Sequence, residues 1–297
     1  METKASAAPC PLTLEEKWER ATLADNFIFY KIMSENPGVC KELLEILLGI
    51  EIDRLEKPIA EKNAKVDYDS KGIRFDVYTK GGGRCFDIEM QTAGRQNLAK
   101  RARYYQGLMD VDTLKAGEAY SALKDSYVIF LCMGDFIGSG LPVSTFENIC
   151  REDKGIALND RAYKVFFNAE KYDTMADREQ KSFFKFLRCG ASESAFTKKL
   201  DAMVERAKHN AQWRHQFMTW SIAMQDAVDA AVEEAVEIAV EQERARSLQE
   251  GAQQKAFETA RKMLETNIGT MEQIADIAGL PLEQVEQLQQ ELCAAEK

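Results

Sequence analysis

Hydrophobic and polar positions repeat with helical spacing near the beginning of the chain. Apolar side chains recur every three to four residues over 14–33, with an interruption near Asp25, and again over 39–48. This spacing places apolar residues on one face of an α-helix. The break Asn36-Pro37-Gly38 separates the two segments, and Gly49 ends the second. We therefore expect helices over 14–33 and 39–48.

Two later runs, 73–79 and 84–91, alternate apolar and polar side chains with a period of two. This alternation is typical of β-strands with one buried face. Lys80-Gly81-Gly82-Gly83 lies between the runs and predicts a tight turn, so we expect a hairpin. The apolar set is Ile73, Phe75, Val77, Phe86, Ile88 and Met90, and the polar set is Arg74, Asp76, Tyr78, Asp87, Glu89 and Gln91.

The side-chain pattern also predicts the register of this hairpin. If apolar residues face apolar neighbours, residue 75 pairs with 88 and residue 77 with 86, as a turn of two or four residues around Gly81-Gly82 would give. Asp76 then lies opposite Asp87, and Glu89 lies diagonally across from Asp76, with Cα atoms roughly 7–8 Å apart. Gln91 points the same way as Glu89, because side chains alternate along a strand.

Two carboxylates at this separation can reach one divalent cation from both sides. Oxygen ligands suit hard ions such as Mg²⁺ or Mn²⁺, which keep several waters and accept phosphate oxygens from a substrate. Acidic residues on the solvated face of a hairpin are also common, so spacing alone leaves both interpretations open. Asp76 and Glu89 are the candidate metal ligands.

Further elements extend the hairpin into a sheet. Residues 97–109 and 177–188 have helical spacing, and residues 127–133 and 163–168 are rich in β-branched and aromatic side chains. The order is thus helix, hairpin, helix, strand, strand, helix. This order favours an α/β fold, a mixed sheet flanked by helices.

The chain changes character at about residue 193. Most residues from there to 264 are strong helix formers, and valines at every fourth position from Val228 to Val240 form a narrow apolar stripe beside many glutamates. Such a helix buries little by itself. We expect a long, solvated α-helical C-terminal extension that packs on itself or on a partner, with a homo-oligomer as one outcome.

Residues 266–297 resemble a helix-turn-helix. Ile274, Val285 and Leu288 occupy positions at which that motif packs its two helices, and Gly279 lies at the turn. Residues 282–292 contain no Lys or Arg, which argues against reading the major groove and favours a small packing or oligomerising unit. The predicted division is a tail (1–19), an α/β domain (20–192), a helical extension (193–265) and this helical pair (266–297).

Composition and charge narrow the functional classes. The chain has 297 residues and is 45% hydrophobic, enough for one sizeable core and an appendage. Its formal net charge of -10 excludes a protein held on DNA by overall charge, because non-specific DNA affinity comes from Lys and Arg. The seven cysteines form no CxxC pair, and no apolar run reaches membrane-spanning length. We expect a cytoplasmic protein without a structural zinc site or a membrane partner.

Three segments together resemble one known family. Asp76 lies in Arg-Phe-Asp-Val-Tyr, and residues 86–91 read Phe-Asp-Ile-Glu-Met-Gln, similar to the Asp…Glu-x-Gln signature of the Rpn family of recombination-promoting nucleases, also called PD-(D/E)XK nuclease family transposases. Residues 100–106, Lys-Arg-Ala-Arg-Tyr-Tyr-Gln, resemble the segment after that signature, and residues 23–31 resemble the family's first helix. The resemblance covers roughly residues 20–190.

The resemblance implies a restriction-endonuclease-like fold and Mg²⁺-dependent endonuclease activity on DNA, linked to recombination or mobile elements. It implies that Asp76 and Glu89 are metal ligands and that the carbonyl oxygen of Met90 is a further ligand. Gln91 stands where the wider superfamily has a lysine, so the site lacks one cation. A catalytically inactive descendant that binds nucleic acid or protein is the alternative function, and RNA is a third option as substrate.

The neighbouring helices offer a replacement cation and an additional carboxylate. Lys100, Arg101 or Arg103 could replace the missing lysine and bind DNA, or could lie on a solvated helix face. Asp25 is either a helix cap or an accessory carboxylate that reaches the metal site.

Overall fold

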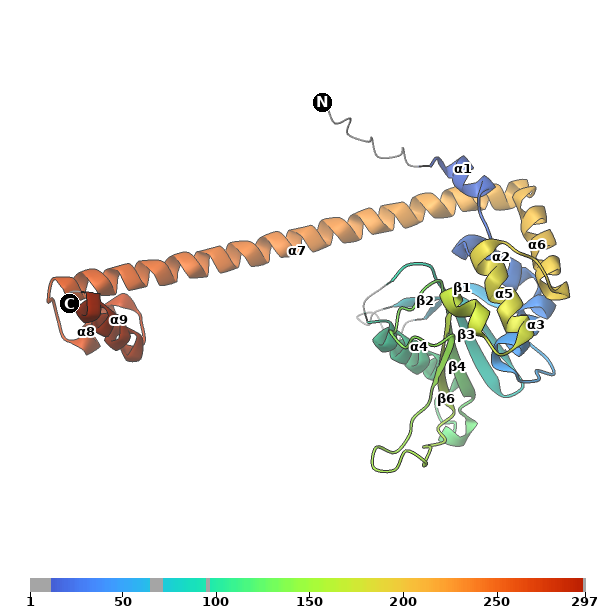
Figure 1. The fold of residues 1–297 in the computed structure, drawn as a ribbon, viewed down its shortest axis with the longest axis horizontal. Helices are drawn as coiled ribbons and strands as arrows, with labels where there is room; N and C mark the ends of the chain where they lie inside the picture. Colours follow the sequence, from blue (N-terminus) through green and yellow to red (C-terminus); the bar gives the residue numbers. More distant parts are fainter. Residues whose placement is uncertain (1–11, 65–71, 95–96, 296–297) are drawn as a thin grey trace. The chain divides into compact units, whose positions relative to one another are not determined.

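The computed structural model describes residues 12–64, 72–94 and 97–295, which form two compact units, one up to Trp220 and one from Ser221 on (Figure 1). The elements are α1 (Leu14–Glu19), α2 (Asn26–Glu35), α3 (Pro37–Leu48), β1 (Ile59–Ala64), β2 (Ile73–Gly81), β3 (Arg84–Gln91), α4 (Leu98–Thr113), η1 (Tyr120–Ala122), β4 (Asp125–Cys132), β5 (Val143–Phe146), β6 (Ala162–Asn168), η2 (Ala169–Thr174), α5 (Arg178–Cys189), α6 (Ala195–Lys208), α7 (Ala211–Glu265), α8 (Met271–Ala278) and α9 (Leu282–Ala295).

A mixed sheet forms the centre of the first unit. Within the described residues it has six strands in the order β1-β2-β3-β4-β6-β5. β1, β2 and β3 are antiparallel neighbours, β3, β4 and β6 run parallel, and β5 is antiparallel to β6. α4 connects β3 to β4 across one face, because parallel neighbours need a crossover. The expected α/β fold, a mixed sheet flanked by helices with a long C-terminal helix, is confirmed.

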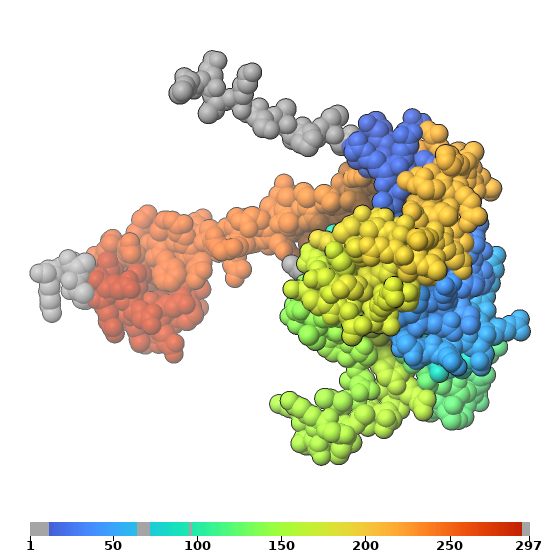
Figure 2. Space-filling view, turned by 45° about the vertical axis from the view of Figure 1, so that its right-hand side comes forward, coloured from blue at the N-terminus to red at the C-terminus, as the bar shows by residue number. Residues whose placement is uncertain are grey.

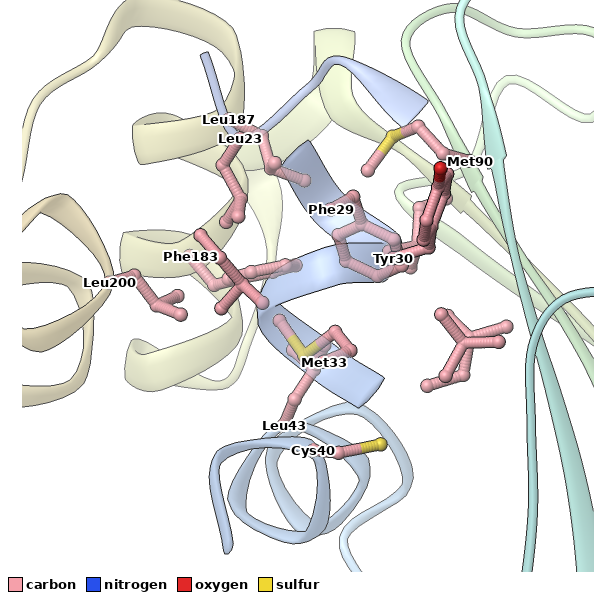
Figure 3. Packing of buried hydrophobic residues seen from close by; sticks show 14 of the residues in the cluster. Leu23, Phe29, Tyr30, Met33, Cys40, Leu43, Met90, Phe183, Leu187 and Leu200 are labelled. Atoms are coloured by element: carbon pink, nitrogen blue, oxygen red, sulfur yellow. The ribbon is translucent and has the colours of Figure 1, made fainter. Parts of the chain in front are cut away.

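Helices cover both faces of this sheet. α4 packs on one face, where Phe75, Tyr105 and Phe130 belong to one buried cluster (Figure 1). α2, α3, α5 and α6 pack on the other face around a larger cluster, in which Met90 of β3 lies beside Tyr30 of α2 (Figure 3). The segment that follows β5 projects from the body of the unit (Figure 2).

The helices agree with the sequence pattern, with small shifts at their ends. The segment 14–33 is divided into α1 and α2, as the interruption near Asp25 indicates. α3 begins at Pro37 and ends before Gly49, whose φ of 65° lies in the left-handed region that favours glycine. β1 and β5 were not predicted: β1 reads Ile-Ala-Glu-Lys-Asn-Ala without apolar alternation, and β5 is four residues long.

The hairpin of β2 and β3 has a register different from the predicted one. Val77 pairs with Ile88 and Gly81 with Arg84, so the turn consists of Gly82 and Gly83. Both turn glycines have positive φ, 58° and 75°, as a two-residue type I′ turn requires. Gly81 stays in the strand, where a Cβ would lie 2.3 Å from the carbonyl oxygen of Arg54. The predicted pairs 75–88 and 77–86 were therefore wrong, because the turn lies one residue later.

The alternation predicted that Phe75 and Val77 share one face of the sheet. This prediction was wrong. The ring of Phe75 stacks on Tyr78 at 5.2 Å between centroids and contacts Tyr105, so Phe75 belongs to the cluster under α4. Val77 of β2 and Phe86, Ile88 and Met90 of β3 lie in the cluster on the opposite face. The pairing of β2 with β3 extends from Gly81–Arg84 to Val77–Ile88. Phe75 and Val77 thus belong to clusters on opposite faces although they are two residues apart, and Asp76 lies between them.

The second unit contains most of α7 together with α8 and α9. Ile274, Val285 and Leu288 are buried with Ala260 of α7, which confirms the predicted packing of the helical pair. The expected extension is two helices rather than one, because α6 ends at Lys208 and α7 begins at Ala211. The division of the chain into 1–19, 20–192, 193–265 and 266–297 stays a prediction. No helix among the described residues is long and apolar enough to cross a membrane.

Candidate functional site

Asp76 of β2 and Glu89 of β3 are neighbours joined by hydrogen bonds between backbone and side chain. They follow the pair Val77–Ile88 in the hairpin. The backbone N–H of Asp76 donates to Oε1 of Glu89 at 2.9 Å, and the backbone N–H of Met90 donates to Oδ2 of Asp76 at 3.1 Å. The predicted pairing of Asp76 with Asp87 was wrong, because Asp87 pairs with Tyr78. Each carboxylate accepts a hydrogen bond from the opposite strand's backbone.

The Met90 backbone completes this group of oxygens. The N–H and C=O of one strand residue point toward the same neighbouring strand. Because the Met90 N–H points to Asp76, the Met90 carbonyl faces Asp76 as well. The Met90 side chain is buried on the opposite face of the sheet, beside Tyr30 (Figure 3). This packing fixes β3 at the position of the site.

Arg101 of α4 supplies a cation to the site. Its Nη2 donates to Oε2 of Glu89, and its Nη1 donates to Oε1 of Gln91 at 2.9 Å. Its Nε donates to the hydroxyl of Tyr105 at 2.9 Å, and the guanidinium lies 5.4 Å from the ring centroid of Phe130. Arg101 thus contacts both Glu89 and Gln91.

α4 holds Arg101 in place through its own buried face. Ala102 and Tyr105 are buried in the cluster between α4 and the sheet. The side chain of Gln106 is buried as well, and its Nε2 donates to the backbone carbonyl of Ser126 at 3.2 Å and to the hydroxyl of Ser126 at 3.0 Å. These contacts place the first turns of α4 above the C-terminal end of β3.

The other predicted cations and the predicted accessory carboxylate lie apart from this group. Lys100 and Arg103 are exposed on α4. The carboxylate of Asp25 accepts a hydrogen bond from the backbone N–H of Thr22 at 2.7 Å. No hydrogen bond joins Asp25 to Asp76 or Glu89 within the described residues. Asp25 is the N-cap residue of α2, but its side chain makes no capping hydrogen bond to that helix. The roles of Lys100 and Arg103 and an accessory role of Asp25 stay predictions.

Burial and mutual repulsion make the carboxylates of the site weak acids. Burial raises the pKa of Asp76 to about 6. Burial, together with the neighbouring charge of Asp76, raises the pKa of Glu89 to about 8, although Arg101 opposes this shift. A cation between the two carboxylates would favour their ionised forms. The site therefore holds more potential negative charge than Arg101 balances.

Asp87 adds a third carboxyl group to this layer and was not among the predicted site residues. It lies two residues before Glu89 on β3, is completely buried, and neither of its oxygens has a hydrogen-bond partner among the described residues. Burial and the charges of Glu89 and Asp76 raise its pKa well above the ordinary range. The alternation of side chains along β3 had already placed Asp87 and Glu89 on one face, and this pattern could have identified Asp87 as a site residue.

Glu61 is a second residue that the sequence pattern missed. The neighbouring pairs Ala60–Val77 and Lys62–Phe75 place Glu61 beside Asp76 on β1. Its carboxylate binds Arg74 at 3.0 Å and accepts a hydrogen bond from Nε1 of Trp220 at 2.8 Å. Its φ of 51° is unusual for a residue with a side chain. No sequence signal identified Glu61, because β1 has no strand-like alternation.

The donor atoms of the site fit a hard divalent cation. The carboxylates of Asp76 and Glu89 and the carbonyl of Met90 are oxygens, which Mg²⁺ and Mn²⁺ prefer. Within the described residues, no group of three or more Asp, Glu, His or Cys side chains could hold a metal ion by itself. An ion here would thus complete its coordination with water and substrate oxygens, as Mg²⁺ commonly does.

Comparison with known proteins identifies the family. No curated protein and no solved structure matches the chain significantly. The family model of the PD-(D/E)XK nuclease family transposases matches residues 25–267, which include both strands of the carboxylate pair and the helix that carries Arg101. The neighbouring acidic residues, the oxygen donors and this match over most of the chain lead to one conclusion: the chain belongs to the PD-(D/E)XK nuclease family transposases.

Proposed function

We propose that this protein is a divalent-metal-dependent endonuclease that hydrolyses phosphodiester bonds of DNA in recombination or in a mobile element. The observation that carries this proposal is the pair formed by Asp76 and the buried Glu89, whose carboxylates accept hydrogen bonds from the backbone N–H groups of Met90 and Asp76. A nuclease is the activity that the family membership suggests. Mg²⁺ is the proposed ion, and Mn²⁺ is a substitute with the same ligand preference.

In this proposal, the residues of the chain bind the ion and orient the substrate. Asp76, Glu89 and the Met90 carbonyl hold the ion at the edge between β2 and β3. When bound, the ion supplies a water of lowered pKa and offsets negative charge on the reacting phosphate. Lys100 and Arg103, exposed on the same helix as Arg101, contact the DNA backbone.

Arg101 takes the part of the missing lysine. Its side chain is 25% exposed while it bonds Glu89 and Gln91, so its guanidinium can reach both the site and solvent. Without a metal, Arg101 favours the ionised form of Glu89 and lowers its pKa against the effect of burial. Once a divalent ion does so, the guanidinium is available to donate hydrogen bonds to a phosphate oxygen. Gln91 orients Arg101 through the bond from Nη1.

The second candidate is a non-catalytic descendant of the fold that binds nucleic acid or protein. The bonds from Arg101 to both Glu89 and Gln91 favour it, because the guanidinium already occupies the carboxylate that a metal would bind. The two candidates differ in whether a metal displaces Arg101 from Glu89.

Cleavage assays with the purified full-length chain separate these candidates. We expect nicking of supercoiled plasmid with Mg²⁺ or Mn²⁺, no nicking with EDTA, and no nicking by Asp76→Ala or Glu89→Gln. Asp112→Asn is the matched control, because Asp112 lies on α4 and bonds Lys62, Lys80 and Tyr78 rather than the site. A labelled RNA of the same sequence tests substrate choice. Absence of metal-dependent cleavage of any DNA would overturn the endonuclease proposal.

A further inference from the structure

Four cations form a stripe along α5, on the face of the sheet opposite to α4. Arg178, Lys181, Lys185 and Arg188 follow one another at steps of three and four residues, which places them on one side of the helix. The part of the chain that contains α5, yellow in Figure 2, forms part of the surface of this unit. The chain as a whole carries a formal charge of -10, so this stripe has the opposite sign to the net charge of the protein.

A cavity of about 310 Å³ lies along this stripe. Three of the four cations line it, with Glu193 as the acidic residue among the lining side chains. Its volume holds a phosphate group and several waters, since a water occupies about 30 Å³ in the liquid. The lining residues are Tyr172, Arg178, Lys181, Ser182, Lys185, Glu193 and Ser194.

The polar groups of this cavity are incompletely satisfied. Lys185 forms an ion pair with Glu193, and Nζ of Lys181 donates to the backbone carbonyl of Asp173 at 2.7 Å. Arg178 has no ion pair within the described part of the chain. The hydroxyl of Ser182 is buried, with the residue 7% exposed, and has no hydrogen-bond partner there. A buried hydroxyl without a protein partner is uncommon in native proteins, and a bound water or ligand group supplies the missing hydrogen bond in such cases.

The stripe also connects to the edge of the sheet at which the carboxylate pair lies. Nη1 of Arg188 donates to the carbonyl of Met133 at 2.8 Å, and the N–H of Met133 donates to the carbonyl of Gln91 at 2.9 Å. Arg178 lies ten residues from Arg188 along the helix, which corresponds to about 15 Å. The cations thus lead from the neighbourhood of Gln91 to the cavity.

We propose that this cavity binds a phosphate group, with Arg178 and Lys181 supplying positive charge and Ser182 a hydroxyl donor. Cations in a concave site attract a phosphate, and hydrogen bonds that involve an ionised group are the stronger ones. The phosphate has two sources, the backbone of a bound DNA or a free phosphate. The DNA source rests on the proposed function, whereas the free-phosphate source does not.

The first experiment measures DNA binding without cleavage. Fluorescence anisotropy with a labelled duplex is recorded for the full chain carrying Asp76→Ala, at several salt concentrations. Adding Arg178→Ala and Lys181→Ala should weaken binding several-fold and make the salt dependence shallower by about two phosphate contacts. Lys198→Ala with Lys199→Ala removes the same charge from α6 outside the cavity lining and should change the salt slope less.

The second experiment measures inorganic phosphate binding to the full chain by calorimetry and thermal unfolding. Ser182→Ala should leave the melting temperature of the phosphate-free protein unchanged or raised, because the hydroxyl has no partner to lose. It should nevertheless weaken phosphate binding several-fold, and Arg178→Ala should weaken it further. A merely structural serine would show the opposite pattern, a lower melting temperature without an effect on phosphate.

The two experiments together decide between the sources. Loss of DNA affinity without binding of inorganic phosphate assigns the cavity to the DNA backbone, and phosphate binding without an effect on DNA assigns it to a free phosphate. If the cavity variants change neither measurement, the inference is wrong. Absent cleavage by the wild-type chain would overturn the proposed function and leave these binding results standing.

Discussion

The two ends of α4 both lie next to acidic residues, but the pKa values of these residues are raised at one end and lowered at the other. At its first turns, Arg101 faces a layer with the carboxyl groups of Asp76, Asp87 and Glu89. Burial comes first among the causes that raise the pKa of each carboxyl group, and neighbouring acidic charge adds to it. This end of the helix has more carboxyl groups than cations.

At the last turn of α4, one carboxylate is surrounded by donors. Asp112 accepts from Nζ of Lys80 at 3.0 Å, from the hydroxyl of Tyr78 at 3.0 Å and from Nζ of Lys62. Burial alone would raise its pKa, but these hydrogen bonds outweigh it and hold the pKa at about 2. The comparison shows two ways to balance the charge of an acidic residue inside a fold. Cations and donors of the chain itself balance it, as at Asp112, or a bound ion does. At Asp76 and Glu89 we infer that the missing part is a metal ion.

The largest expected difference between the two ends is in DNA cleavage. Glu89→Gln should lower metal-dependent cleavage by at least about 10³-fold, because the ion loses a charged ligand. Asp112→Asn should retain cleavage within a few-fold. Rates on a supercoiled plasmid, with circular dichroism to verify folding, make this comparison. Equal losses in both variants would mean that the two ends of α4 do not differ in function.

Replacement of Arg101 should affect catalysis and metal binding in opposite directions. Arg101→Ala should lower the cleavage rate by about 10²-fold, because a donor to the reacting phosphate is lost. It should tighten metal binding, since the guanidinium no longer competes for Glu89. Lys198→Ala is the control, because it removes an exposed cation from α6, outside the proposed site and its DNA contacts. Cleavage by Arg101→Ala at the wild-type rate would show that Arg101 does not take part in catalysis.

Stability should also change in opposite directions at the two ends. Asp87→Val replaces a buried carboxyl group without hydrogen-bond partners and should raise the free energy of unfolding by about 1–2 kcal/mol in EDTA. Asp112→Asn should lower it by about 1 kcal/mol, because the partly exposed ion pairs with Lys62 and Lys80 are lost. Urea unfolding measures both values. A destabilised Asp87→Val would show that the Asp87 carboxyl group is satisfied in the native protein.

The pH dependence of stability should carry both signs in the metal-free protein. The pKa of Asp112 is depressed from 3.8 to about 2, so its contribution is present above pH 4 and is lost as the pH falls toward 2. The pKa of Glu89 is raised from 4.5 to about 8, so its contribution is present below pH 4.5 and is lost as the pH rises through 8.

Two variants separate these limbs of the pH profile. The free energy of unfolding is measured with urea in EDTA as a function of pH. Asp112→Asn should reduce its fall at acidic pH, and Glu89→Gln should reduce its fall at alkaline pH. Each effect should be on the order of 1 kcal/mol after allowance for coupling between the carboxyl groups. If Glu89→Gln leaves the alkaline limb unchanged, Glu89 is ionised in the native protein without a metal.

Much of the first unit followed from local sequence patterns. Period-two alternation located both strands of the hairpin, and the resemblance selected Asp76 and Glu89. The register required the close contact of Gly81 with Arg54, which no local pattern contains. The pairing of Arg101 with Glu89 and Gln91 depends on how α4 packs through Gln106 and Tyr105. The sequence alone therefore could not distinguish Arg101 from Lys100 and Arg103 as the cation of the site. β1, with Glu61, depends on its pairing with β2 rather than on its own residues.

Direct titration with Mn²⁺ tests the central claim, that the chain leaves the pair of Asp76 and Glu89 to be completed by a divalent ion. Electron paramagnetic resonance of the full-length protein at pH 8 measures free and bound Mn²⁺, and added Mg²⁺ measures competition. We predict a bound Mn²⁺ that Mg²⁺ displaces, lost in Asp76→Asn and in Glu89→Gln and retained in Asp112→Asn. Equal Mn²⁺ binding by all these proteins, or no binding by the wild-type chain, would contradict the account.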